Sequence, residues 1–526
     1  MPFPGLARLL VTSRRISPLF AAVFSSRSKE RKQHRQIDKS IDNRGKICIS
    51  TRLRSSLRRS ELESRERILL DQTFSAENLR KLSEKEKRRG RVRDLDFFES
   101  VRMKTEDLKQ AIRETKEFRR LHPGKYSDEE QAEFNHIKDR REEKRRERDD
   151  MLLQELRNIS KKISKKDFEV PFSQKDGPGG KKVYVIDQGA PEQFYAVKKL
   201  ESNLASLYRL KPANRNEVMN QLISIVSDGF DYHVLRTDIS KFFESIPHER
   251  ILNKLKEDQL LSQKSLRLIA GILFRYARFA NTPGIGLPRG LGISSYLSEL
   301  YMRDFDRRVK MFDDVVFYAR YVDDIIVLFA PIPGSDVRLK RSAIRGYLSD
   351  ISLTMNESEQ KTRESPFDTR GIPVAKRSWN FEYLGYDINF RSGLTVSMSR
   401  KRLDRYKNRI AACFLRYESQ RSKNQKKAYR LIIKRVRFLT SNTQLSHNKS
   451  NAYVGIYYNN MHLTSDKDLR ALDAILTAKS SALSSPSLNA KLSTYSFMRG
   501  FNERTFRRFH KKDEFREIVE AWKYEK

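Results

Sequence analysis

Three aspartates stand at the edges of apolar, strand-like segments, where together they could carry out phosphoryl-transfer chemistry. Asp238 lies in the segment 235–246, and Asp323 and Asp324 lie in the segment 317–329. The apolar residues on both sides of the Asp pair predict two buried strands with the pair at the turn between them. Burying adjacent carboxylates beside a third is prohibitive without a cation, and hard oxygen ligands suit Mg²⁺ or Mn²⁺. Because paired metal ions catalyse in-line phosphoryl displacement, the sequence predicts nucleotidyl transfer.

The alternative for the Asp pair is a solvated turn, since Asp is common in turns. A short motif such as Tyr321-Val-Asp-Asp324 also matches by chance. Three further segments make the pattern more specific. A Gly/Pro-rich loop that runs into a predicted helix covers 284–302, a polar segment covers 356–362, and a strand-like segment covers 381–390.

Taken in this order, the segments resemble motifs A to E of reverse transcriptases, with Leu384-Gly385-Tyr386 at the primer-gripping turn. The resemblance implies an α+β, right-hand polymerase fold of fingers, palm and thumb. It also implies that Asp238 and Asp323 bind both of two Mg²⁺ (or Mn²⁺) ions, with Asp324 completing the site. Other positions fall where this family binds the nucleotide, namely Phe243, Lys182, Lys211, Arg215, Pro288, Arg289, Gly290 and Lys361.

The position five residues after Asp238 faces the sugar of the incoming nucleotide in this family, and here it is Phe243. A bulky ring there excludes a 2′-hydroxyl, so the resemblance implies deoxynucleotides. The Tyr-Val-Asp-Asp form of the motif agrees, since RNA-copying RNA polymerases usually carry Gly-Asp-Asp. The alternative is that Phe243 is a core aromatic in a strand-to-helix turn.

The loop before the predicted helix departs from the common Pro-Gln-Gly pattern, because it reads Pro288-Arg289-Gly290. It is closer to the abortive-infection and defence-associated reverse transcriptases of bacteria. We expect Gly290 to let the backbone approach the nucleobase, and Ser294 or Ser295 to cap the helix.

Three more segments resemble a narrower group. They look most like the first enzyme of the type-three antiviral systems, which encode two reverse transcriptases and a noncoding RNA; the segments are 70–79, 211–215 and 236–239. This resemblance implies an antiviral role, with a noncoding RNA as template or scaffold and possibly a second reverse transcriptase as partner.

Composition agrees with a polyanion-binding protein. The 107 basic and 68 acidic residues give a net charge of +39, which predicts strong, salt-dependent binding to nucleic acid. A merely solvated or ribosome-like basic surface is the alternative. The cysteines Cys48 and Cys413 are far apart, which favours a reducing, cytoplasmic location and argues against structural zinc. No apolar run approaches the length of a membrane span.

Six regions are expected along the chain. Residues 1–29 have five basic and no acidic residues and in isolation resemble an organelle presequence, but an upstream start or a disordered basic arm explains this composition equally well. The regions are a basic, disordered N-terminal extension (1–66), a helical N-terminal region (67–166), fingers (167–234), palm (235–390), a basic helical thumb (391–445) and a mainly helical C-terminal extension (446–526).

The fingers and thumb supply the expected contacts to the substrates. Strands at 167–172 and 181–186 should flank the turn 176–180, and Lys182, Lys211 and Arg215 should face the triphosphate, unless they are surface charges. The thumb should follow the nucleic-acid backbone, although a helical bundle with a charged outer face has the same pattern. The thumb residues that should bind nucleic acid are Arg402, Arg405, Arg409, Lys427 and Arg430.

The function expected is that of an RNA-directed DNA polymerase that uses an RNA template and deoxynucleoside triphosphates and makes a DNA product. A retron- or intron-type reverse transcriptase is the enzyme alternative, although no intron-maturase zinc or nuclease module is visible. A catalytically idle polymerase fold that binds RNA as a scaffold is the non-enzyme alternative. The complete set of three aspartates counts against it.

Overall fold

The computed structural model describes residues 70–508 and 512–522, apart from 92, 178–179, 188, 229, 231, 334–335, 366–378, 391–392 and 446–451. It also describes two short antiparallel strands, β1 (Ser40–Ile41) and β2 (Ile47–Cys48). The chain forms two compact units, residues 1–70 and 71–526. The rest of the predicted extension at 1–66 lies outside the described residues.

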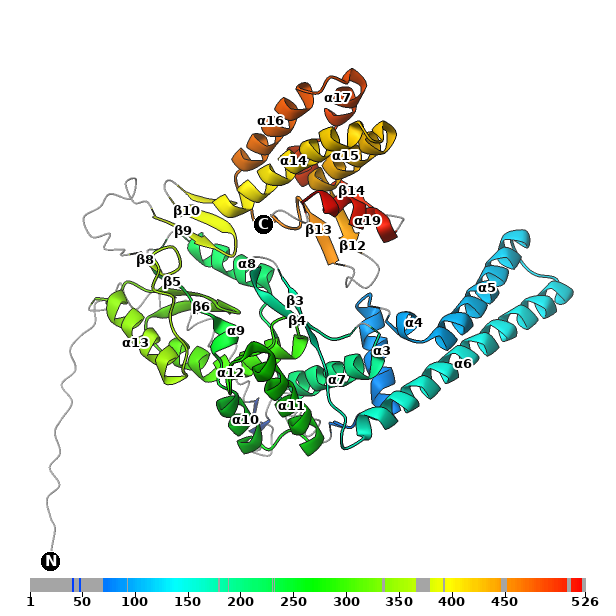
Figure 1. The fold of residues 1–526 in the computed structure, drawn as a ribbon, viewed down its shortest axis with the longest axis horizontal. Coiled ribbons are helices and arrows are strands. Elements are labelled where there is room, and N and C mark those ends of the chain that lie inside the picture. Colours follow the sequence, from blue (N-terminus) through cyan, green and yellow to red (C-terminus); the bar gives the residue numbers. More distant parts are fainter. Residues whose placement is uncertain are drawn as a thin grey trace, which may run out of the picture. The chain divides into compact units, whose positions relative to one another are not determined.

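Unit 71–526 begins with helices. These are α3 (Ala76–Arg88), α4 (Asp94–Phe97), α5 (Glu99–Leu121) and α6 (Asp128–Ser164), and Figure 1 shows α5 and α6 side by side. Ser127 and Glu130 form a capping box at the start of α6, which satisfies otherwise unpaired backbone N–H groups. Only the C-terminal part of α6 buries an apolar face, with Leu152, Leu156, Ile159 and Ile163. The Ser-x-x-Glu spacing and the 3–4-residue spacing of the apolar side chains predict both features from the sequence.

The hairpin of the predicted fingers is formed by β3 (Ser173–Asp176) and β4 (Lys182–Val185), which pair antiparallel. The predicted strand at 181–186 is therefore confirmed by β4. The predicted strand at 167–172 is wrong, since the observed strand, β3, begins at Ser173. Pro171 explains the shift, since proline cannot donate a ladder hydrogen bond. The helices α7 (Pro191–Leu207) and α8 (Arg215–Val226) follow.

The central sheet has four antiparallel strands in the order β6-β7-β5-β8. They are β5 (His233–Asp238), β6 (Val315–Tyr321), β7 (Asp324–Phe329) and β8 (Arg363–Ser365). Residues 325–329 of β7 are all buried, as expected for a strand covered on both faces. The helices between the strands are α9 (Phe242–Ser245), α10 (His248–Glu257), α11 (Gln263–Ala280), α12 (Gly292–Lys310) and α13 (Val337–Asp350).

A second antiparallel sheet packs near the first and shares its core. Its strands are β9 (Trp379–Tyr383), β10 (Tyr386–Phe390) and β11 (Leu394–Met398). Val234, Ile326 and Leu328 of the central sheet belong to the same buried cluster as Ile388 of β10 and Leu222 of α8. The packing fixes the turn between β9 and β10 relative to the end of β5.

The C-terminal part is one packed body rather than a thumb followed by a separate extension. One buried cluster combines Ile410 of α14 and Ile432 of α15 with Leu472 of α16 and Phe497 of α18. A sheet also pairs β12 with both β13 and β14, so the expected boundary between 445 and 446 falls inside it. The elements are α14 (Arg400–Arg421), α15 (Gln425–Thr440), β12 (Asn442–Leu445), β13 (Ala452–Gly455), α16 (Lys467–Ser481), α17 (Pro486–Leu492), α18 (Phe497–Asn502), β14 (Phe506–Arg507) and α19 (Lys512–Val519), followed by a 3₁₀ turn (Glu520–Trp522).

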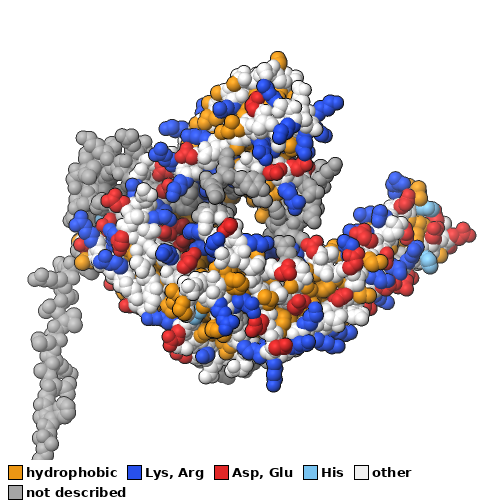
Figure 2. Space-filling view, viewed as in Figure 1, with side chains coloured by type: hydrophobic (Ala, Val, Ile, Leu, Met, Phe, Trp, Pro, Cys, Tyr) orange, Lys and Arg blue, Asp and Glu red, His pale blue; other side chains and the backbone are white. Residues whose placement is uncertain are grey.

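Lysine and arginine side chains are spread over the face seen in Figure 2, with acidic side chains among them. Within the described residues, no helix is long and apolar enough to cross a membrane.

Candidate active site

The structure brings the three predicted aspartates together at one end of the central sheet. Asp238 is the last residue of β5, Asp324 is the first residue of β7, and the two are paired in register. Asp323 occupies the turn before β7, and the backbone N–H of Ile239 donates to its carbonyl at 3.2 Å. The strand register, set by the buried residues that follow, therefore places these aspartates, which we call the acidic triad, side by side.

The turn that carries Asp323 is tight and strained. Tyr321 pairs with Asp324 across β6 and β7, which leaves Val322 and Asp323 as a two-residue turn. Val322 has φ +63°, in the left-handed region that β-branched residues avoid. Such a conformation costs about 1–3 kcal/mol and persists only where its surroundings hold it.

Mutual repulsion within the acidic triad is visible in the electrostatics. Burial raises the pKa of Asp323, the Asp238 charge raises it further, and Lys361 and Lys181 oppose both effects. Burial and then the Asp323 charge likewise raise the pKa of Asp324, while Arg236 lowers it. Cations that approached this end of the sheet would relieve the repulsion.

A cationic side chain lies beside each of the outer carboxylates. The Lys361 ammonium lies 3.2 Å from Oδ2 of Asp238, and Arg236 Nη2 lies 3.7 Å from Oδ1 of Asp324. Asn356 also donates its side-chain amide to Oδ2 of Asp238 at 3.3 Å. No group of three His, Cys, Asp or Glu side chains in the described part of the chain converges on one point as a finished metal site. The donor set, three carboxylates with hard oxygens, nevertheless fits divalent ions such as Mg²⁺.

Phe243 lies in α9, shortly after Asp238 in the chain. Its neighbour Phe242 is the core aromatic, at 2 % exposure, whereas Phe243 is only partly buried. The guanidinium carbon of Arg289 lies 5.3 Å from the centre of the Phe243 ring, and Nη2 of Arg289 donates to Glu244 at 2.7 Å. The ring therefore has an accessible face close to the loop that contains Pro288 and Gly290.

Gly290 makes a close backbone approach, but to the β3–β4 hairpin. At φ +101°, an added Cβ would lie 2.4 Å from Cγ1 of Val183 and 2.8 Å from the Tyr184 carbonyl. The Tyr184 N–H also donates to the Arg289 carbonyl at 2.7 Å. This contact between two segments of the chain requires a glycine, and the predicted approach of Gly290 to the nucleobase stays a prediction.

The expected serine cap of the following helix is wrong. The helix α12 begins at Gly292 with Leu291 as its N-cap and no side-chain cap. Ser294 instead donates its hydroxyl to the Pro288 carbonyl at 2.8 Å, which braces the loop.

The cations predicted in the fingers are engaged with protein groups. Lys182 pairs with Asp176 at 2.7 Å and Lys211 with Glu217 at 3.5 Å. Arg215 donates to the Leu384 carbonyl at 2.7 Å, so its placement does not match the expected triphosphate contact. The hairpin lysine whose charge reaches Asp323 is Lys181, which sequence reasoning missed. Lys181 lies just before β4, in the turn of the hairpin, whereas Lys182 is the first residue of the strand.

The predicted primer-gripping turn joins β9 and β10. Tyr383 pairs with Tyr386, and the turn residues Leu384 and Gly385 both have positive φ, +45° and +74°. The Tyr383 hydroxyl donates to the Asp324 carbonyl at 3.5 Å, a long hydrogen bond that links the turn to the acidic triad. The turn therefore lies beside the candidate site.

Arg402 does not lie on the exposed thumb surface that the sequence predicts for it. Its guanidinium donates to the Leu384 carbonyl at 2.9 Å and to the Asn459 carbonyl at 3.1 Å. It also lies 4.3 Å from the centre of the Tyr386 ring, and Arg215 lies over the same ring at 5.1 Å. These contacts help to fix the turn, and the nucleic-acid-binding role of Arg402 stays a prediction.

The other predicted thumb cations differ in exposure. Arg405, Lys427 and Arg430 are exposed, while Arg409 is partly buried with its guanidinium 5.7 Å from the centre of the Trp522 ring. The exposed three are free of the internal contacts that engage Arg402.

Sequence reasoning also missed Arg320, whose side chain is only 3 % exposed at the end of β6. It pairs with Glu299 and Asp306 of α12, and it donates to the Val322 carbonyl at 2.9 Å. The sequence did contain a signal for this role, because Arg320 is a charged residue in an otherwise apolar strand. A buried charge is expected to be paired with an opposite charge.

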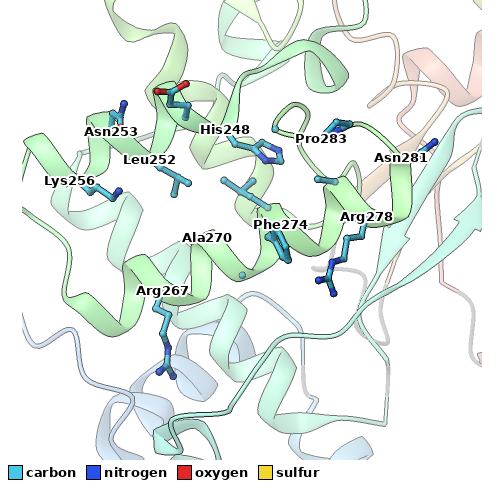
Figure 3. Close-up of a pocket in the computed structure, with 15 residues that line it drawn as sticks. His248, Leu252, Asn253, Lys256, Arg267, Ala270, Phe274, Arg278, Asn281 and Pro283 are labelled. Atoms are coloured by element: carbon cyan, nitrogen blue, oxygen red, sulfur yellow. The ribbon is translucent and has the colours of Figure 1, made fainter.

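A groove of about 910 Å³ between α10 and α11 is separate from the acidic triad. Figure 3 shows His248 and Leu252 on one side and Phe274 and Arg278 on the other. None of the residues that line it belongs to the site predicted from the sequence.

A match to a known protein family covers the strands that carry the acidic triad. Residues 197–388 match the family described as reverse transcriptase (RNA-dependent DNA polymerase). No curated protein matches the chain. Among solved structures, the chain is similar to telomerase from Candida albicans in a complex with a fragment of telomeric RNA, at 14 % identity and a TM-score of 0.30. The match covers 59 % of this chain and 59 % of the telomerase chain.

The α+β architecture and the strand-end aspartates define a polymerase fold. Residues 197–388, which match the reverse transcriptase family, contain all three aspartates of the acidic triad.

Proposed function

We propose that the protein synthesises DNA on an RNA template with two divalent metal ions held by Asp238, Asp323 and Asp324. The observation that carries the proposal is the register of β5 and β7, which places three carboxylates together inside the domain that matches reverse transcriptases. The pKa values of Asp323 and Asp324 are raised by burial and then by repulsion between the carboxylates, and bound cations would relieve both costs. Bound Mg²⁺ or Mn²⁺ would activate the primer 3′-hydroxyl and stabilise the leaving pyrophosphate.

The surrounding residues have roles that follow from their chemistry. Lys361 and Lys181 place positive charge where the phosphates of a nucleotide would gain negative charge. The accessible face of Phe243 would lie against the sugar and exclude a 2′-hydroxyl. The turn at Leu384 and Gly385, fixed by Arg215 and Arg402, would hold the primer terminus.

The biological setting is a second part of the proposal. The resemblance of the loop 288–290 and of the segments 70–79, 211–215 and 236–239 to defence-associated enzymes supports an antiviral role in a bacterial cytoplasm. In that setting a noncoding RNA would serve as template or scaffold, and a second reverse transcriptase would be a partner. The net charge of +39 suits a protein that keeps an RNA bound.

The test is DNA synthesis by the purified protein. The protein is incubated with its co-purifying RNA, or with a primed RNA, together with deoxynucleotides and Mg²⁺, and the product is sequenced. We expect a DNase-sensitive product complementary to the RNA. A protein that binds RNA but makes no DNA with either Mg²⁺ or Mn²⁺, on any supplied template, would support the scaffold alternative instead.

A further inference from the structure

Arg320 uses all its hydrogen-bond donors in a buried network beside the acidic triad. Its Nε and Nη2 each donate to Asp306 at 2.8 Å, and Nη1 and Nη2 donate to Glu299 at 3.3 and 2.8 Å. The remaining Nη1 hydrogen goes to the Val322 carbonyl at 2.9 Å. A guanidinium has five N–H donors, so this set accounts for each of them.

The Val322 carbonyl links this network to the turn that carries Asp323. It belongs to the peptide that joins Val322 to Asp323, in the turn where Val322 has φ +63°. A β-branched residue does not stay in the left-handed region without support. The hydrogen bond from Arg320 fixes the plane of this peptide. It thereby also fixes the backbone position from which the Asp323 side chain extends.

The other end of the network is anchored to α12. Glu299 and Asp306 are seven residues apart and therefore share a face of this helix. The Tyr318 hydroxyl donates to Oδ1 of Asp306 at 2.6 Å and orients that carboxylate. Burial lowers the pKa of Arg320, but the bond and charge of Asp306 and the charge of Glu299 outweigh burial and raise it, so the guanidinium stays charged. The turn is thus tied to the helix that begins just after the loop 288–290.

We propose that Arg320 is a positioning residue for Asp323, which holds the turn 321–324 against α12 so that the Asp323 carboxylate is presented to divalent ions. The proposal rests on the proposed function, because it concerns the same carboxylates. The competing explanation is an ion pair that only stabilises the fold.

The main test is Arg320→Lys, which keeps a positive charge for Glu299 and Asp306 but has three donors in place of a planar fork of five. Supporting residues of metal ligands typically change metal affinity or activity by about 10–100-fold, so we expect kcat and Mn²⁺ affinity each to fall at least about tenfold. The KM for deoxynucleotides should change little. Mn²⁺ binding is measured without substrate, from the electron paramagnetic resonance signal of the free ion.

The matched control is Arg308→Lys. Arg308 lies on the same helix α12 but is exposed and pairs with Asp350 at 2.7 Å, away from the turn. Both kcat and Mn²⁺ affinity should stay at wild-type values in this control.

A rescue variant separates positioning from stability. Val322→Gly removes the side chain that disfavours positive φ, so the turn depends less on the bond from Arg320. We expect the Arg320→Lys, Val322→Gly double variant to bind Mn²⁺ more tightly than Arg320→Lys alone. A double variant that is no better than Arg320→Lys would contradict the positioning role.

A milder variant keeps the test decisive if Arg320→Lys does not fold. Asp306→Asn retains an acceptor for Arg320 but loses one charge, which should loosen the anchor and weaken Mn²⁺ binding in a folded protein. If this variant lowers only the melting temperature, Arg320 is a structural ion-pair partner and the inference fails.

The outcomes also distinguish this inference from the proposed function. An active wild type whose Arg320→Lys variant matches it in kcat and Mn²⁺ affinity would refute the role of Arg320 and leave DNA synthesis standing. A wild type that makes no DNA would refute the proposed function, while the Mn²⁺ comparison would still decide the role of Arg320.

Discussion

The Lys361 ammonium lies 3.2 Å from Oδ2 of Asp238, so the aspartate at the end of β5 has a cation beside it before any metal binds. Lys361 is 39 % exposed and Asp238 only 9 %, which leaves the lysine able to move while the carboxylate stays. The pair offsets part of the repulsion in the acidic triad. Under the proposed function, this ammonium would also neutralise charge on the triphosphate.

Replacing Lys361 should therefore slow the reaction without dismantling the site. Removing one preorganised donor to charge that develops in the transition state costs about 10²–10³-fold in rate, and we expect Lys361→Ala to lower kcat to a similar extent. Steady-state kinetics on a primed RNA would measure it. Lys254→Ala is the control, since Lys254 pairs with Asp304 at 3.6 Å on α12 and has no contact with the acidic triad. Equal rates for the Lys361 variant and the wild type would show that Lys361 has no role in the active site.

The raised pKa of Asp323 predicts a pH-dependent stability in the metal-free protein. A carboxylate whose pKa lies above its unfolded value of 3.8 destabilises the fold progressively as pH rises from 3.8 through the folded pKa, and by a constant amount above it. Asp323→Asn removes this effect. In EDTA, its melting temperature should exceed that of the wild type at neutral pH, by a margin that shrinks as pH falls toward 3.8.

Added Mg²⁺ should reduce the difference in melting temperature between Asp323→Asn and the wild type at neutral pH. The reason is that the ion stabilises the wild type, which binds it well, and not the variant. Thermal melts across pH, with EDTA and with Mg²⁺, test both statements. A variant that melts below the wild type in EDTA would show that Asp323 stabilises the metal-free fold, contrary to the pKa argument.

Sugar selection should depend on Phe243. If its accessible face meets the sugar, Phe243→Ala removes the overlap with a 2′-hydroxyl and should raise ribonucleotide use relative to deoxynucleotide use by about tenfold or more. Competition between the two nucleotides in single-nucleotide extension measures the ratio. Phe242 is not a suitable control position, because its side chain is buried in the core, with 2 % exposure. An active Phe243→Ala protein with unchanged discrimination would mean that another residue selects the sugar.

RNA affinity should depend on the exposed thumb cations. Arg405, Lys427 and Arg430 are exposed, so reversing all three to Glu should weaken RNA binding. Each lost phosphate contact should reduce the slope of log K against log salt by about 0.7–0.9. Filter binding over a range of salt concentrations measures both quantities. Arg402 is left unchanged because its donors hold the turn at Leu384.

The same experiment addresses whether a dedicated RNA is bound. A scrambled RNA of equal length should compete poorly at physiological salt if the partner has one defined fold. Equal competition would mean nonspecific polyanion binding, and the noncoding-RNA part of the proposal would be withdrawn.

The acidic triad could be predicted from the sequence because its position depends on local patterns. The apolar run after Asp324 requires a buried strand, and strand pairing then fixes where Asp323 and Asp238 meet. The contacts of Arg402 and Arg215 could not be predicted this way. Both depend on the Leu384 carbonyl, which tertiary packing alone brings to them.

Charge patterns were the least reliable guide. Lys181 and Lys182 are neighbours with the same chemistry, yet Lys182 pairs with Asp176, while the charge of Lys181 reaches Asp323. Similarly, the amino-acid composition changes between the predicted thumb and the predicted C-terminal extension, and this change suggests a domain boundary. The shared core of Ile432 and Leu472 shows that apolar packing continues across it.

The most direct test of the account is Asp323→Ala, assayed beside the wild type for DNA synthesis and for RNA binding in the same buffer with Mg²⁺. Asp323 is in the turn at the end of the central sheet, and its pKa is raised by burial, so its removal should not harm the metal-free fold. We predict that incorporation of deoxynucleotides falls below detection while RNA affinity and its salt dependence remain those of the wild type. Deoxynucleotide incorporation by the folded variant at the wild-type rate would contradict the account.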